Sequence, residues 1–306
     1  MDVGVKSELT FGDVVFSIIN YTVLIGFTII CVFPFWYIFV NTISNNEMSA
    51  AGEIVLFPRG LHFSNYLSMR EIPGLFQAAF ISVSRTAIGT IATVIAAAFL
   101  GFIFTREMLG RKIFYRMLIA SMYFNAGLIP YFITIMRMGL LNSFWVYIIP
   151  LIVQPFSVLL VKTYIESTPI SLQESAEIDG AGPLRIFVSI ILPLSKPILA
   201  TVAIFAAIGQ WNSFMDTVLF ITDERLWTLQ FVLHRYISQA GFLARLIQSA
   251  MAGVGVVDIA AIMANEQTPT SVRMTVTMVA TLPILFVYPF FQKYFTKGIM
   301  IGAVKG

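Results

Sequence analysis

Long runs of apolar residues, separated by short polar segments, follow one another along most of the chain. An α-helix needs roughly 20 apolar residues to cross a bilayer, because each residue adds about 1.5 Å against a hydrocarbon core of about 30 Å. The pattern predicts six membrane-spanning helices, with the approximate bounds 14–43, 76–105, 113–135, 144–164, 197–221 and 272–295. We therefore expect an all-α membrane protein, with residues 1–306 forming a single transmembrane domain.

The composition supports this class. Hydrophobic residues make up 58% of the 306 residues and charged residues only 11%, and the mean hydropathy is +0.85. A soluble domain of this size would need a more polar surface. The net charge of +3 is small and its lysines and arginines are scattered, so the sequence predicts no nucleic-acid partner.

Motifs for catalysis and metal binding are missing from the sequence. No stretch fits the phosphate-binding loop G-x-x-x-x-G-K-[ST], the G-x-S-x-G elbow or the H-E-x-x-H zinc motif. Cys31, His62 and His234 are isolated, so neither a disulfide nor a metal site is expected. We expect no enzyme activity and no cofactor in this chain, and any ATP and Mg²⁺ to be bound by a partner subunit.

Basic residues predict the orientation. The loop after the second apolar run has one acidic residue, Glu107, among the basic residues Arg106, Arg111, Lys112 and Arg116. The carboxyl-terminal tail adds Lys293, Lys297 and Lys305. Because cytoplasmic loops are enriched in Lys and Arg, both termini should be cytoplasmic, and residues 45–75 and 222–271 should face outward.

Residues 240–264 are apolar enough to resemble a seventh span. However, Arg245 and Asp258 lie within them, and each would cost about 2.5–3.5 kcal/mol at the bilayer centre. A seventh span would also move the basic tail to the outer side. We therefore interpret this stretch as a helix within an external loop, 222–271, that is either interfacial or fully external.

The segment 165–195, between the fourth and fifth runs, predicts two short helices joined by a bend. Ser171 is a suitable N-cap, and Glu174 three residues later completes a capping box. The first helix should run over 172–179 and end at Gly180. A second helix, 184–192, should then lead into the fifth span.

This loop resembles a family signature. Glu174-Ser175-Ala176, then Gly180, and later Ile190-x-Leu192-Pro193 are similar to the EAA motif of ABC importer permeases, with Ser175 in place of the usual alanine. The string E-x-A-x-x-D-G-A resembles the maltose-type, six-span carbohydrate-uptake branch. Further similarity lies in FLGFIFTREMLGRKIF, ATVAIFAAIGQWNSFMD and FVYPFFQKYFTKGIMIGAVKG, so that the resemblance covers most of residues 76–306. Within the family it is nearest to permeases for complex polysaccharide or glycan fragments.

The resemblance implies that the loop is a cytoplasmic coupling element that docks on the ATPase. The implied contact residues are Glu174, Ser175, Ala176, Asp179, Gly180 and Ala181. Glu174 would be the charged contact, Gly180 the bend, and the two alanines would allow close approach. The tail 298–306 would also touch the ATPase.

The same resemblance implies an assembly in the bacterial inner membrane. Its other members would be a second, homologous permease, a dimer of ATP-binding subunits and an extracytoplasmic substrate-binding lipoprotein facing 222–271. Closure of the ATPase dimer would rock the spans and switch access to an oligosaccharide path between the two sides.

Polar and aromatic residues inside the predicted spans are candidates for lining that path. They are Tyr123, Asn125, Gln154, Gln210, Trp211, Asn212, Asp216 and Arg85. Aromatic faces stack on sugar rings, and amides bind hydroxyl groups. The alternative for each is an interhelical hydrogen bond, worth about 0.6 kcal/mol. Arg85 and Asp216 fall at similar depth, so we also expect them to pair.

The residues leave other transporter classes open. One alternative is an ABC permease for a peptide, amino acid or ion. Another is an ion-coupled secondary transporter, which would need buried carboxylates along its path, and the sequence offers few beyond Asp216.

Overall fold

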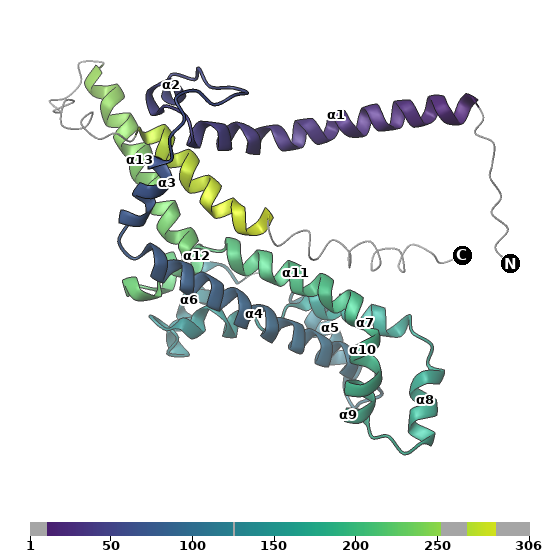
Figure 1. The fold of residues 1–306 in the computed structure, drawn as a ribbon. Helices are drawn as coiled ribbons and strands as arrows, with labels where there is room; N and C mark the ends of the chain where they lie inside the picture. Colours follow the sequence, from purple (N-terminus) through teal and green to yellow (C-terminus); the bar gives the residue numbers. More distant parts are fainter. Residues whose placement is uncertain (1–10, 125, 252–267, 286–306) are drawn as a thin grey trace. The chain divides into compact units, whose positions relative to one another are not determined.

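The computed structural model describes residues 11–124, 126–251 and 268–285, and all regular elements in these ranges are helices (Figure 1). The chain divides into two compact units. The first takes in Met1–Glu71 and Tyr236–Val279, and the second takes in Ile72–Arg235 and Ala280–Gly306.

The first unit begins with α1, a continuous helix of 32 residues over Phe11–Thr42. It is long and apolar enough to cross a membrane, and Pro34 lies within it without ending it. Its buried residues are confined to the last turn, Val40 to Thr42. The first predicted span therefore corresponds to one helix of spanning length.

Buried polar side chains attach the short elements after α1 to its end. Ser49 donates to the Asn41 side-chain oxygen over 2.7 Å, and Asn41 donates to the carbonyl of Ile54 over 3.2 Å. Asn46 and Asn65 exchange two amide hydrogen bonds of 3.1 and 2.9 Å. These bonds order two short helices, α2 (Asn46–Ala50) and α3 (Ser64–Ser68), and the short 3₁₀ helix η1 (Met69–Glu71) follows α3.

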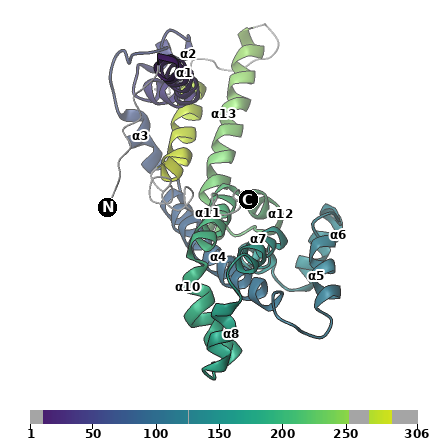
Figure 2. The ribbon, with the colours of Figure 1, turned by 90° about the vertical axis from the view of Figure 1, so that its right-hand side faces the viewer.

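In the second unit, α4 is a 29-residue helix over Leu75–Ile103, close to the predicted second span. Two helices, α7 (Pro155–Glu166) and α11 (Lys196–Asn212), pack along it (Figures 1 and 2). A buried apolar cluster forms between these helices and the loop that joins α7 to α11. Its members include Phe102, Val161, Ile186, Phe187 and Val202.

Two glycines allow the close approach of α4 to its neighbours. A Cβ at Gly101 would lie 2.9 Å from Val161 Cγ1 and 3.1 Å from the backbone nitrogen of Lys162 on α7. A Cβ at Gly89 would lie 2.5 Å from the Gln210 amide nitrogen on α11. Small residues at such positions let helix backbones pack closely, which is a main source of stability between membrane helices.

We expect Gly101→Ala to lower the stability of the protein by about 1–3 kcal/mol, because the new methyl group meets backbone atoms that cannot move without shifting α7. Thermal unfolding in detergent measures the change. Gly209→Ala on α11 is the matched control, since a Cβ there has no atom within 4 Å. Equal stability of both variants would contradict the close-packing argument.

The third predicted span, 113–135, is not one continuous helix. It is divided into α5 (Arg111–Ala120) and α6 (Leu128–Arg137), each of 10 residues and so too short to cross a bilayer alone. Residues 121–123 form a turn after α5, and Gly127, just before α6, has φ 82° and ψ 172°, a non-helical conformation that suits glycine. Hydropathy alone did not detect this break.

The fourth predicted span is also bent. Two 3₁₀ turns, η2 (Phe144–Tyr147) and η3 (Ile149–Leu151), precede α7 and meet it at 44°. Pro155 is the first residue of α7, and a residue before proline is disfavoured in the helical region. Gln154 accordingly has an extended backbone, which separates the two parts.

The fifth predicted span, 197–221, is divided as well. The helix α11 ends at Asn212, Ser213 is extended, and α12 (Met215–Phe220) follows. In the described part of the chain, two helices are long and apolar enough to span, or up to four elements if each bent pair forms one span. The total of six spans stays a prediction.

The last described elements are η5 (Glu224–Leu226), α13 (Leu229–Met251) and a helical stretch over residues 269–285. α13 lies within the segment 222–271, whose external location stays a prediction. Asp258, the three tail lysines and the tail 298–306 lie outside the described residues.

Candidate functional site

The loop predicted to couple to an ATPase begins with α8, a helix over Ser171–Ile178. The predicted capping box is wrong, because Ile170 occupies the cap position and no side chain caps the helix. The carbonyl oxygen of Ile170 accepts the N–H groups of Gln173 and Glu174 at 2.9 and 3.1 Å. Since the preceding turn already satisfies these first N–H groups, a Ser171 cap is not needed.

The predicted end of this helix at Gly180 is confirmed. Gly180 has φ +78°, a left-handed conformation that few residues other than glycine adopt readily. Its N–H donates to the carbonyl of Glu177 at 3.0 Å, and the N–H of Ala181 donates to that of Ala176 at 2.9 Å. This pair of bonds is the Schellman motif, which closes a helix and reverses the chain direction.

The second half of the loop is longer than the predicted helix 184–192. It consists of α9 (Pro183–Ile186), a π-turn η4 (Phe187–Ile191) and α10 (Leu192–Leu194) in one helical run. Pro193 has no N–H to donate, and the π-turn lies directly before it, where the regular bonding pattern is interrupted. The run meets α11 at 78°, and α8 lies beside α9 and α10 at one end of the unit (Figures 1 and 2).

The residues predicted to contact the ATPase fall into two groups in this loop. Glu174, Ser175, Asp179 and Gly180 are exposed. Ala176 and Ala181 instead pack against the apolar cluster around Phe102 and Phe187. The alanines thus bring α8 close to the chain's own helices, and their contact with a partner stays a prediction.

Several apolar side chains of the loop are exposed, and we refer to four of them together as the loop patch. Their exposed fractions are 67% for Ile170, 44% for Leu172, 86% for Ile178 and 69% for Leu184. Sequence reasoning did not single out these residues, although apolar positions on a short helix between two polar turns were visible in it.

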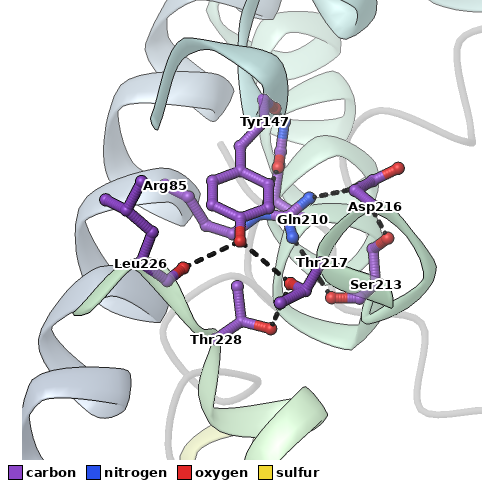
Figure 3. A network of polar contacts seen from close by, with 8 residues as sticks. All are labelled: Arg85, Tyr147, Gln210, Ser213, Asp216, Thr217, Leu226 and Thr228. Carbon is purple, nitrogen blue, oxygen red and sulfur yellow. Dashed lines mark hydrogen bonds and ion pairs between the residues drawn. The ribbon is translucent and has the colours of Figure 1, made fainter. Parts of the chain in front are cut away.

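A second candidate site is a buried polar network around Arg85 of α4 (Figure 3). Arg85 Nη2 lies 2.9 Å from Asp216 Oδ2, and Nε donates to Gln210 Oε1 over 3.0 Å. Nη1 donates to the carbonyl of Ser213 over 3.2 Å. The Ser213 hydroxyl in turn donates to Asp216 over 2.8 Å. The predicted pairing of Arg85 with Asp216 is confirmed.

Tyr147 of η2 extends the network. The Arg85 guanidinium lies over its ring, 4.4 Å from the centroid. Its hydroxyl donates to the carbonyl of Leu226 over 2.8 Å and lies 2.9 Å from the hydroxyl of Thr217 (Figure 3). Thr217 also contacts the hydroxyl of Thr228 at 3.0 Å. The network therefore joins α4, α11, α12 and η2 to the segment around η5.

The burial of Arg85 determines what the network can do. Its side chain is 1% exposed, and each of its three guanidinium nitrogens has an acceptor. A buried ion is tolerated only when charge and hydrogen bonds are both satisfied, as they are here. In this conformation Arg85 and Gln210 join neighbouring elements and, at 1% and 2% exposed, have almost no surface to offer a cargo.

The other predicted path residues do not join this network. Tyr123 is 81% exposed and lies in the turn after α5, and Asn212 is exposed at the end of α11. Gln154 accepts a weak bond from Ser157, 3.4 Å long, and the Trp211 indole donates to the carbonyl of Ala280 over 3.2 Å. Asn125 lies outside the described residues.

Sequence reasoning missed Tyr147, Ser213, Thr217 and Thr228 as network members. A tyrosine hydroxyl within an apolar run must find a partner, so Tyr147 carried a usable signal. Its partners lie 70 and 79 residues further along the chain, and no local pattern points to them.

Comparison with known proteins identifies the family. The chain is 31% identical to the polygalacturonan/rhamnogalacturonan transport system permease protein YtcP of Bacillus subtilis, over 95% of this chain and 98% of that protein. The chain belongs to the carbohydrate-uptake family of ABC transporter permeases. Protein LplC of the same organism is 34% identical over 95% of both chains.

A solved structure supports the same assignment. It is described as a bacterial ABC transporter involved in the import of the acidic polysaccharide alginate, and the match has a TM-score of 0.80 at 26% identity. The match covers 95% of this permease and 100% of that chain. No protein-family model matches the permease.

Family membership confirms the resemblance noted in the sequence. The protein is an all-helical, multi-pass membrane subunit of an ABC importer, and it is not itself the ATPase. Membership of this family also excludes the alternative of an ion-coupled secondary transporter, because ABC importers are driven by a nucleotide-binding partner.

Proposed function

We propose that this permease imports an oligosaccharide by alternating access, driven by an ATPase subunit seated on residues 165–195. The observation that carries the proposal is the loop patch, Ile170, Leu172, Ile178 and Leu184, on the two helical parts of the loop that the Gly180 turn joins. Exposed apolar side chains on a segment that is expected to lie outside the lipid favour a protein–protein interface.

The arrangement of charges supports docking rather than burial in lipid. Glu174 and Asp179 are exposed on or beside α8, close in sequence to the loop patch. Carboxylates are costly in hydrocarbon, whereas an apolar centre with a polar rim is the usual anatomy of a protein interface. The partner surface should therefore be an apolar cleft with basic groups at its edge.

Force applied to such a loop would move the spans as rigid bodies. The loop is continuous with α7 on one side and α11 on the other, and Ala176 and Ala181 pack against the cluster that both helices share. Packed helical cores switch between discrete arrangements more readily than they deform. Closure of an ATPase dimer would thus change access to the path.

Docking of an ATPase on residues 165–195 also implies a membrane topology and a set of partners. The permease would cross the inner membrane six times, with both termini and 165–195 in the cytoplasm and 222–271 outside. A second, homologous permease would complete the path, and a substrate-binding lipoprotein would deliver the sugar to 222–271. ATP and Mg²⁺ would be bound by the ATPase dimer.

The names of the relatives favour a glycan fragment as cargo, because YtcP is described by polygalacturonan and rhamnogalacturonan and the solved structure by alginate. Arg85 is the one basic residue among the predicted path residues, but Asp216 already neutralises it. Exposed Tyr123 and Asn212 are better candidates for sugar contact, by ring stacking and by amide hydrogen bonds.

Copurification tests the docking proposal. Ile178→Asp places a charge on the most exposed residue of the loop patch, and we expect at least about tenfold less ATPase to copurify with a tagged permease, as for a hot-spot residue of an interface. ATP-driven uptake of the cognate oligosaccharide into proteoliposomes should fall with it.

Leu109→Asp is the matched control, because Leu109 is 99% exposed and lies in a different loop of the same predicted side. It should retain the ATPase. The proposal fails if Ile178→Asp also retains it, or if the unmodified permease binds no ATPase and shows no ATP-dependent sugar uptake.

A further inference from the structure

An ion pair connects the proposed coupling loop to a helix that does not flank it. Arg106 Nη1, just beyond the end of α4, lies 2.6 Å from Glu177 Oε1 on α8. The side chains are 29% and 49% exposed. From the sequence, Arg106 was used only as one of the basic residues that predict orientation, and Glu177 was given no role.

Arg106 is firmly attached to α4. Its N–H donates to the carbonyl of Ile103 over 3.1 Å, and its guanidinium lies over the ring of Phe102, 5.3 Å from the centroid. Among the described residues, the bond to Glu177 is the one hydrogen bond of its side chain, since Nε and Nη2 are buried without a partner. The orientation of Arg106 is therefore fixed by α4 on one side and by Glu177 on the other.

The second half of the loop reaches the same end of α4. The Phe187 ring of η4 lies 5.2 Å from that of Phe102 and 5.9 Å from that of Phe99. Both halves of the loop thus contact α4, one by charge and one by aromatic packing. Arg85 lies about 30 Å from Arg106 along α4, at about 1.5 Å per residue. It binds α11 and the segment leading into α12 through the buried network.

We propose that the Arg106–Glu177 ion pair is a positioning contact that passes the movement of α8 to α4, so that sugar movement follows the ATPase cycle. This inference rests on the proposed function. A partly exposed ion pair contributes little to folding, so its loss leaves the fold intact. Its loss instead allows α8 to move without α4, and ATP is then hydrolysed without transport.

The test uses the complete importer in proteoliposomes with its binding protein, and it measures both oligosaccharide imported per ATP hydrolysed and ATPase copurified. We expect Arg106→Gln and Glu177→Gln each to lower the transport-to-hydrolysis ratio at least about fivefold, the lower end of usual coupling effects. Copurified ATPase should stay at the level of the unmodified importer. The charge swap, Arg106→Glu with Glu177→Arg, should recover at least half of the ratio.

Glu166→Gln is the control, because it removes a 2.6 Å ion pair, Lys162–Glu166, that lies within α7 alone and joins no two elements. It should leave the ratio unchanged. An unchanged ratio in both single variants, a swap as poor as the single variants, or loss of ATPase from Glu177→Gln would each overturn the positioning role. If the unmodified importer shows no ATP-dependent uptake, the proposed function itself fails, and this inference with it.

Discussion

Replacing Asp216 by alanine should prevent the permease from accumulating as a folded protein. The substitution leaves the Arg85 guanidinium, 1% exposed, without its counter-charge. Removing one partner of a buried ion pair typically costs about 3–5 kcal/mol, a large part of the stability of most proteins. We expect a severe loss of monodisperse protein in detergent, measured by size-exclusion chromatography of a fluorescent fusion.

A double variant separates stability from transport. Arg85→Met with Asp216→Leu removes both charges, and replacing a whole buried pair by apolar residues is often neutral. This variant should fold again, and sugar uptake then shows whether the pair does more than hold helices together. Glu224→Ala, which removes an exposed carboxylate a short distance along the chain, is the control and should accumulate normally. Normal accumulation of Asp216→Ala would contradict the burial argument.

The sequence predicted best those features that depend on local composition. The helices α1 and α4 lie within a few residues of their predicted bounds, because each is one long and mostly apolar run. Gly180 was predicted correctly for a similar reason, since a left-handed helix end favours glycine wherever it occurs.

Breaks within the apolar runs were not predicted. Hydropathy averages over a window, so one or two polar residues such as Gln154 or Ser213 barely lower it, and it does not report the extended backbone there. The predicted N-cap at Ser171 was wrong for a different reason. A capping side chain is needed only where no backbone oxygen is available, and Ile170 supplies one.

The polar network was predicted in part. The pairing of Arg85 with Asp216 was predicted from their similar expected depth in two membrane spans. Depth can be counted along the sequence of each span, so no knowledge of the packing was needed. Gln210 was recognised as a polar residue, but its bond to the carbonyl of Tyr147 depends on how α11 packs against η2. Such partners follow from tertiary packing, which one sequence does not report.

The largest effect on transport should come from Gly180. Its φ of +78° is unfavourable by about 1–2 kcal/mol for a residue with a Cβ, and by more for a β-branched one. A Cβ at Gly180 would have no atom within 4 Å, so the effect of a substitution arises from the backbone and not from a clash. Gly180→Val should therefore open the Schellman turn and misplace α8.

We expect Gly180→Val to lower ATP-driven sugar uptake at least about tenfold, as for loss of about 1.4 kcal/mol of coupling, with a normal amount of permease in the membrane. Gly180→Asn should retain most of the uptake, because asparagine tolerates the left-handed conformation. Gly182→Ala is the control, since Gly182 has an ordinary φ of −69° and open space around it. If Gly180→Val transports as well as Gly182→Ala, the bend is not what positions α8, and the coupling role of this loop loses its structural basis.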